Sequence, residues 1–119
     1  MVSFGFHILL KNNDTAEKYR QYHQNVWPEV GGPGGALEQI GVKKMRIFFT
    51  DPLRLFMYVE AVDGFDPETG FNPAVKIDPR VQEWCDIMNE QLLERLNPHD
   101  GELVWKLMDD IYNFDVANH

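Results

Sequence analysis

The sequence is poor in cysteine and contains no long apolar run. Its single cysteine, Cys85, cannot form an intramolecular disulfide, so we expect a protein of a reducing compartment such as the cytoplasm. No apolar stretch approaches the roughly 18 residues that a membrane-spanning helix needs. The first residues, MVSFGFHILLK, carry no basic segment followed by a cleavage motif, which favours a folded first strand over a signal peptide.

Basic residues are outnumbered as well. The chain has 11 Lys and Arg against 19 Asp and Glu, a formal net charge of −8. Nucleic acids, anionic membranes and highly phosphorylated ligands are bound by clustered basic side chains, so none of these is expected as a partner. A neutral small molecule or another protein fits this balance better.

Motifs for metals and phosphates are absent too. The histidines, at positions 7, 23, 99 and 119, show neither HxH nor HExxH spacing, and one cysteine cannot make a thiolate site. The glycine-rich GGPGG at 31–35 lacks the Lys-Ser/Thr of a phosphate-binding loop, and no GxSxG elbow occurs. We therefore expect no metal and no cofactor, with proton transfer left to His, Tyr and carboxylates.

The hydrophobic pattern predicts one domain, residues 1–119, with the element order β-α-β-β-α-β. Its parts are a strand at 3–10, a helix at about 15–26, a hairpin at 43–50 and 54–61, a helix from Pro79 to Leu96, and a strand at 102–114. GGPGG leaves only a short helical piece at 36–41, and 62–78 is a loop with one helical turn at most.

This order is typical of a ferredoxin-like α+β fold, a four-stranded antiparallel sheet with both helices on one face. The other face carries further large side chains. A homodimer that packs sheet against sheet would bury them.

The segment YRQYHQNVWPEV at 19–30 places Tyr19, His23 and Trp27 four residues apart. On a helix such residues lie about 40° apart on one face. With an ordinary pKa near 6.5, His23 can donate or accept a proton at neutral pH. The alternative is structural: Tyr19 and Trp27 are core aromatics, and His23 is a partly exposed surface residue.

Other candidates have simple structural explanations beside functional ones. His7 alternates with apolar residues in the first strand, so it lines a pocket or is a structural histidine. Trp84 falls on the apolar stripe of the second helix, and Cys85 behaves as a small hydrophobic side chain. Asp109 or Asp110 either faces the apolar side of the last strand as a site carboxylate or is solvated at its end. His99 and His119 fall in a loop and in the tail.

The pattern Y-x3-H-x3-WPE resembles the L-rhamnose mutarotase family, dimeric α+β barrel proteins that interconvert the anomers of a 6-deoxy sugar. Supporting features are Gly41 before the hairpin, Trp84, and the closing strand near 111–112. The resemblance implies a homodimeric, cofactor-free isomerase of a monosaccharide such as L-rhamnose or L-fucose. It also implies that His23 is the general acid and that Tyr19 and Trp84 bind the sugar.

Two positions depart from the family pattern. Met45 stands where the family often has a sugar-binding tyrosine, and Cys85 stands where it often has a second tryptophan. Both are expected to line the sugar pocket, so the reaction is better supported than the substrate. The complementary base is open among water, the Tyr19 hydroxyl and a carboxylate such as Asp109.

Two other function classes stay open from the sequence. Dimeric α+β barrels also include cofactor-free monooxygenases and haem-binding members, in which His23 would be a base or a ligand. A non-catalytic binding or stress-response dimer is the third possibility.

Overall fold

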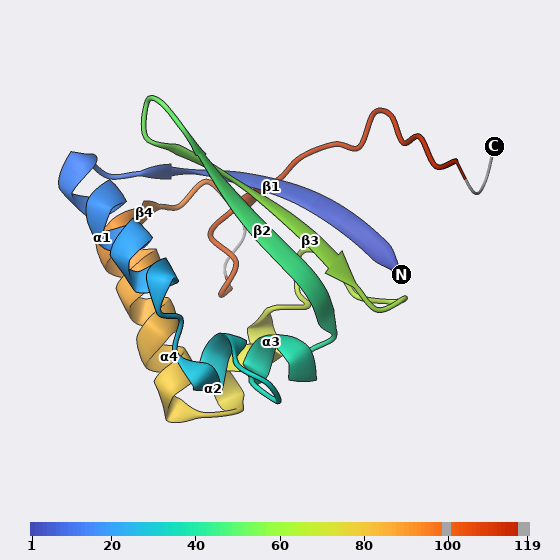
Figure 1. Ribbon diagram of the computed structural model, residues 1–119, viewed down its shortest axis with the longest axis horizontal. Helices are drawn as coiled ribbons and strands as arrows, with labels where there is room; N and C mark the ends of the chain where they lie inside the picture. Colours follow the sequence, from blue (N-terminus) through green and yellow to red (C-terminus); the bar gives the residue numbers. More distant parts are fainter. Residues whose placement is uncertain (99–100, 117–119) are drawn as a thin grey trace.

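The computed structural model describes residues 1–98 and 101–116, so the predictions for His99 and His119 lie outside the described residues. The elements in chain order are β1 (Val2–Leu10), α1 (Asn13–Gln24), α2 (Pro28–Gly31), α3 (Ala36–Gln39), β2 (Val42–Thr50), β3 (Arg54–Ala61), the 3₁₀ helix η1 (Asn72–Lys76), α4 (Pro79–Asp86), the π-helical η2 (Ile87–Leu92), β4 (Leu93–Glu94) and β5 (Lys106–Leu107) (Figure 1).

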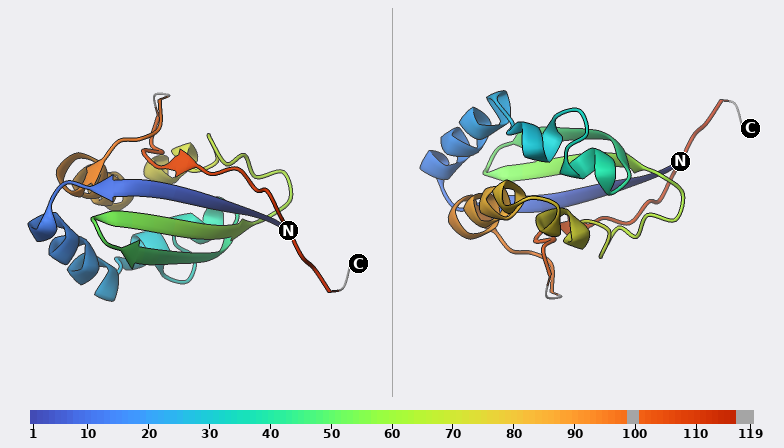
Figure 2. Two further views of the ribbon diagram at one scale, coloured as in Figure 1. Left: turned by 90° about the horizontal axis from the view of Figure 1, so that it is seen from above. Right: turned by 90° about the horizontal axis from the view of Figure 1, so that it is seen from below.

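The antiparallel sheet has the strand order β2-β3-β1-β4, and β5 pairs with β1 beside β4. All the helices lie on one side of this curled sheet and leave its other face open (Figure 2). The predicted α+β arrangement is therefore confirmed. Two short strands share the fourth position of the sheet, beside β1. β4 pairs with Leu9–Leu10 of β1, and β5 pairs with Phe6–His7.

Strand alternation gives the sheet two different faces. The face toward the helices carries Phe6, Ile8 and Val59, whose side chains have no exposed surface. The next residues along the strands point the other way, so cross-strand partners such as His7 and Phe56 share the open face. We call these the inner and the outer face.

The first helix differs from the prediction at both ends. It begins two residues earlier, at Asn13, because the Asn12 side chain accepts from the backbone N–H of Thr15 while the Thr15 hydroxyl accepts from that of Asn12. It ends at Gln24, so Trp27 is not on the helix face of Tyr19 and His23. Instead, Trp27 has extended backbone and precedes α2, whose first residue is Pro28.

The C-terminal elements are shorter than predicted. The second helix buries one side, Val81, Trp84, Met88 and Leu92, and Trp84 lies on it as predicted. The helix stops at Leu92, because the next two residues pair with β1. The last strand contains only Lys106–Leu107. Since β4 already occupies part of the same edge of β1, little of that edge is left for the closing segment.

Candidate functional site

Helices and inner face enclose a cavity of about 140 Å³. Four of the predicted site residues line it: Tyr19 from α1, Met45 from β2, and Trp84 and Cys85 from α4. The remaining lining is mainly apolar. The cavity sits where a ligand would be held between the sheet and the helices.

His23 lies one turn beyond Tyr19 on α1, at an adjoining hollow of about 350 Å³. Tyr19 and Ile47 line both spaces, so the two adjoin. The imidazole stacks on the Tyr19 ring with centroids 4.1 Å apart and meets Trp84 edge-on at 5.4 Å. The structure thus brings all five predicted site residues together. Tyr19 is buried and His23 is partly exposed, as the structural alternative expects, and the imidazole also contacts two aromatic rings.

The hydrogen bonding of His23 fixes which nitrogen is available. Its Nδ1 lies 2.8 Å from the carbonyl oxygen of Tyr19. A carbonyl only accepts, so Nδ1 carries a proton and Nε2 is the nitrogen that can exchange one. Burial lowers the pKa of His23, and the bond to the carbonyl opposes that shift in part.

Tyr19 is suited to donating a hydrogen bond rather than to taking a proton. Its side chain is buried, with 6% of its surface exposed. Burial raises the pKa of the Tyr19 hydroxyl above its ordinary value of 10.0. The phenol therefore stays protonated across the physiological range, which removes it as the complementary base.

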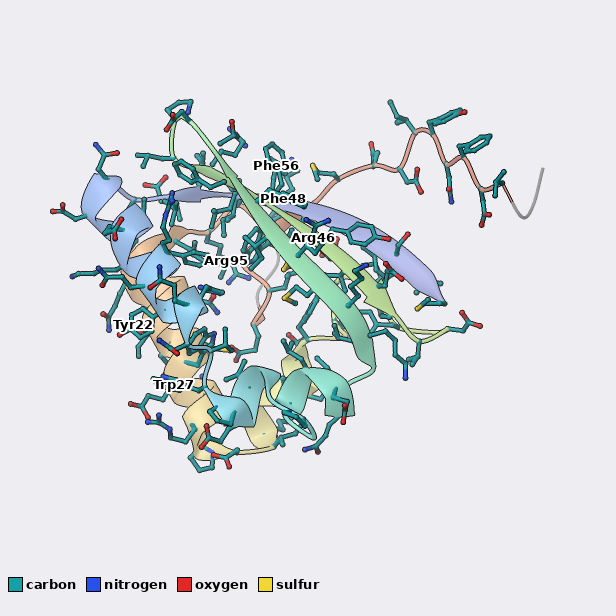
Figure 3. The ribbon with its side chains drawn as sticks, in the orientation of Figure 1. Tyr22, Trp27, Arg46, Phe48, Phe56 and Arg95 are labelled. Carbon is teal, nitrogen blue, oxygen red and sulfur yellow. The ribbon has the colours of Figure 1, made fainter. Side chains whose placement is uncertain are left out.

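An aromatic cluster fixes the position of Trp84. Its ring meets Tyr22 at 5.7 Å and Trp27 at 5.2 Å, both nearly edge-on. The guanidinium of Arg80 lies 3.8 Å from the centroid of the Trp27 ring. Figure 3 shows Tyr22 and Trp27 beside the helices. Trp27 of the WPE segment therefore packs against Trp84, which lines the cavity.

Cys85 contributes to the cavity without being a nucleophile. Burial, with smaller contributions from the carboxylates of Glu102 and Asp86, raises the pKa of its thiol to about 11. A thiol that is protonated at neutral pH is a poor nucleophile and a small apolar surface.

Sequence reasoning missed Glu102 and Asn89, which also line the cavity. The backbone of Glu102 is held at both ends: its N–H donates to Asn72 Oδ1 at 3.0 Å, and its carbonyl accepts from Asn89 Nδ2 at 3.1 Å. Glu102 is the one carboxylate among the residues that line this cavity. No local pattern marks it, because it precedes the last strand in a loop.

Other sequence candidates lie away from the cavity. Asp109 and Asp110 are exposed and follow β5 rather than lying within a strand, so of the two alternatives for them the structure fits solvated carboxylates at the strand end. His7 lies on the outer face, where Arg54 Nη1 donates to its Nδ1 at 2.7 Å. Burial, with Arg54 and Lys106 nearby, lowers the pKa of His7. It is a structural histidine of that face.

Among residues 1–98 and 101–116, no three His, Cys, Asp or Glu side chains gather as metal ligands would. None of the helices in this part of the chain is long and apolar enough to cross a membrane.

Comparison with known proteins assigns the family. The family model of L-rhamnose mutarotase matches residues 3–114. The chain is 36% identical over 109 residues to a UPF0734 protein of Dictyostelium discoideum, covering 90% of this chain and 84% of that protein. The crystal structure of an L-rhamnose mutarotase from Formosa agariphila superposes with a TM-score of 0.67 at 18% identity, over 97% of this chain and 100% of the other.

The structural match shows a shared fold, and the family model covers nearly the whole chain. The resemblance seen in the Y-x3-H-x3-WPE segment is therefore confirmed. The chain belongs to the L-rhamnose mutarotase family and is a carbohydrate isomerase.

Proposed function

We propose that the protein is a sugar mutarotase that interconverts the α and β anomers of a 6-deoxy pyranose such as L-rhamnose or L-fucose. His23 is the general acid, and no cofactor takes part. The observation that carries the proposal is the position of His23: its imidazole stacks on Tyr19 and contacts Trp84 at the edge of the one cavity that both aromatics line.

The reaction needs only two proton transfers. Nε2–H of the imidazolium protonates the ring oxygen while the anomeric hydroxyl loses its proton, the C1–O5 bond breaks, and an open aldehyde forms. Rotation about C1–C2 and return of both protons closes the ring from the other face. A lowered pKa makes the His23 imidazolium a stronger acid, and the Tyr19 carbonyl keeps its Nδ1 proton in place.

Glu102 is the best-placed complementary base. It lines the cavity, and its backbone N–H and carbonyl both form hydrogen bonds. Of the three candidates from the sequence, Tyr19 is disfavoured by its raised pKa and Asp109 by its exposure, and water has no position fixed by the protein. Its carboxylate would take the proton of the anomeric hydroxyl. The pair then ends each cycle in its starting protonation state.

The lining favours a sugar with an apolar side. Met45, Met57 and Met88 contribute flexible thioethers to the cavity, and Trp84 offers an aromatic face. A 6-deoxy sugar presents a methyl group that such a wall can cover. Met45 and Cys85 supply neither the hydroxyl nor the second indole of the family pattern. The preferred sugar therefore forms fewer polar contacts with the cavity wall than the family pattern would provide.

We also propose that the protein works in the cytoplasm as a homodimer in which the outer faces of the two sheets are covered. The support is the single cysteine and the large side chains that the outer face leaves exposed, Phe48 at 45% and Tyr58 at 38%.

Saturation-transfer proton NMR on the anomeric resonances of L-rhamnose and L-fucose tests the function. Wild-type protein should carry saturation between the α and β signals, and His23→Ala should lower that rate by about 10²- to 10⁴-fold, the usual worth of a general acid. His7→Ala, a histidine of the outer face, is the matched control and should keep the wild-type rate. Absence of transfer with either sugar in the wild type would contradict the proposal.

A further inference from the structure

The hollow that contains His23 has a polar side that the proposed mechanism does not use. Arg20 and Gln24 line it together with Tyr19 and His23, and no Asp or Glu is among the described residues of its wall. Arg20 carries five N–H donors and stays charged at every physiological pH. The hollow therefore presents hydrogen-bond donors beside the general acid.

A ring on the opposite wall holds the Arg20 side chain in place. Arg20 lies on α1, one residue after Tyr19 and three before His23. Its guanidinium lies 5.5 Å from the centroid of the Phe49 ring, which belongs to β2. Phe49 is the cross-strand partner of the buried Leu55, so it points toward the inner face. Contact with the face of a ring orients a guanidinium and leaves its N–H donors free.

The donors of Arg20 have no acceptor inside the protein. Within residues 1–98 and 101–116, Arg20 takes part in neither of the two ion pairs, and its guanidinium forms no hydrogen bond. Most exposed arginines are simply hydrated. Arg20 differs from them in its position, because it lines the same hollow as the general acid and is packed against a ring there.

The proposed position of the sugar shows which hydroxyl group would face Arg20. The thioethers of Met45, Met57 and Met88 cover the methyl group, which is bonded to C5, inside the cavity. In a pyranose ring C2 lies directly across from C5. The hydroxyl on C2 therefore points out of the cavity and into the adjoining hollow, where Arg20 lies.

We propose that Arg20 is a further substrate-binding residue, whose guanidinium donates to the hydroxyl on C2 and so selects 6-deoxy pyranoses that carry one. This inference rests on the proposed mutarotase function and names a part of the sugar that the site recognises. Arg20 supplies a charged donor to a site in which Met45 and Cys85 supply neither a hydroxyl nor an indole.

One variant and one altered sugar test this contact together. Arg20→Met removes all five donors and keeps a long unbranched side chain that is compatible with a helix and with packing on Phe49. The sugars are L-rhamnose or L-fucose, whichever the wild type converts faster, and its 2-deoxy analogue. Saturation-transfer NMR over a range of sugar concentrations, corrected for the spontaneous mutarotation of each sugar, gives kcat and KM.

The expected results form a cycle. Arg20→Met should raise KM for the parent sugar about 10- to 100-fold and leave kcat within about twofold, because it removes a hydrogen bond from a charged donor that the ground state and the transition state share. Wild-type protein should show a similar increase in KM for the 2-deoxy analogue. With that analogue, wild type and Arg20→Met should have the same KM within about twofold.

A neighbouring cation provides the matched control. Lys18→Met makes the same kind of change two residues earlier on α1, at an exposed side chain outside the hollow, and should leave KM for both sugars unchanged. Far-UV circular dichroism and thermal melting show whether each variant folds. The comparison of the two sugars with wild-type protein needs no variant at all.

Three results would overturn the inference and leave the mutarotase function standing. The first is an unchanged KM for the parent sugar in Arg20→Met. The second is an equal increase for both sugars in that variant, because Arg20 would then act without contacting the hydroxyl on C2. The third is a wild-type KM that is the same for the parent sugar and its 2-deoxy analogue. A wild type inactive on both L-rhamnose and L-fucose would instead overturn the proposed function, and this inference with it.

Discussion

The inner and outer faces of the sheet are made from alternate residues of the same strands, yet they differ in nearly every respect. The inner face is apolar and covered by helices, and it holds a cavity with a tyrosine and a carboxylate at its wall and a histidine at the adjoining hollow. The outer face is basic and open, and it carries exposed aromatic side chains. Because side chains alternate along a strand, each strand supplies two different surfaces.

The largest expected difference between the faces is in stability. Trp84→Ala removes a buried indole that three aromatic rings contact, and should lower the free energy of unfolding by about 3–5 kcal/mol. Phe48→Ala on the outer face should lower it by less than about 1 kcal/mol in the monomer, since its ring is 45% exposed. Urea denaturation at low protein concentration measures both. Equal losses would mean that the outer ring is part of the core.

The second difference concerns carboxylates. Glu102→Gln should lower the mutarotation rate about 100-fold, because an amide cannot take the proton of the anomeric hydroxyl. Glu94→Gln, which changes an exposed carboxylate of β4, should leave the rate as in the wild type. NMR saturation transfer with both variants measures the two rates. A Glu102→Gln protein that keeps the wild-type rate would show that another group is the base.

The third difference is in pH dependence, and its sign follows from the lowered pKa of His23. As the general acid, His23 must be protonated, so the rate should fall as the pH rises through a value below the ordinary 6.5. The unfolded chain binds this proton more readily than the folded one, so folding stability should decrease as the pH falls below about 6.5. His23→Gln should flatten both profiles. A rate that instead rises through the same pH would make His23 a base.

The smallest expected effect concerns how the cavity wall binds the sugar. Met45→Tyr restores a hydroxyl to the cavity wall, and one added hydrogen bond should lower KM for L-rhamnose roughly 3- to 10-fold. Ile47→Val, a change without a hydroxyl on the same strand, is the control and should leave KM nearly unchanged. Steady-state NMR exchange rates over a range of sugar concentrations provide KM. An unchanged KM in Met45→Tyr would place the sugar away from β2.

Local sequence determined much of the scaffold. The period-two pattern of residues 3–10 and the hairpin around the Asp-Pro-Leu turn predicted β1, β2 and β3 closely, and the stripe Val81, Trp84, Met88 and Leu92 predicted the buried face of the second helix. These signals are strong because burial of one face imposes a fixed period on the chain. The spacing of Tyr19 and His23 likewise placed two site residues on one helix face.

The ends of elements needed the whole fold. The helix after Pro79 stops at Leu92 because Leu93 and Glu94 find hydrogen-bond partners in β1, and the last strand is short because that edge is already partly occupied. Neither fact is encoded in the residues concerned. Competition between helix and strand hydrogen bonds is decided only when the other strand is in place.

The residues of the site and of the outer face were also determined partly by the local sequence and partly by the tertiary structure. The sequence by itself determined the α+β order and a histidine one helical turn after a tyrosine. Only the tertiary structure decided that Glu102, more than 70 residues after His23 in the printed sequence, lines the adjoining cavity, and that four separated cations, Lys44, Arg46, Arg54 and Lys106, share one face of an acidic protein. Contacts between residues far apart in the chain depend on packing, for which no short-range pattern exists.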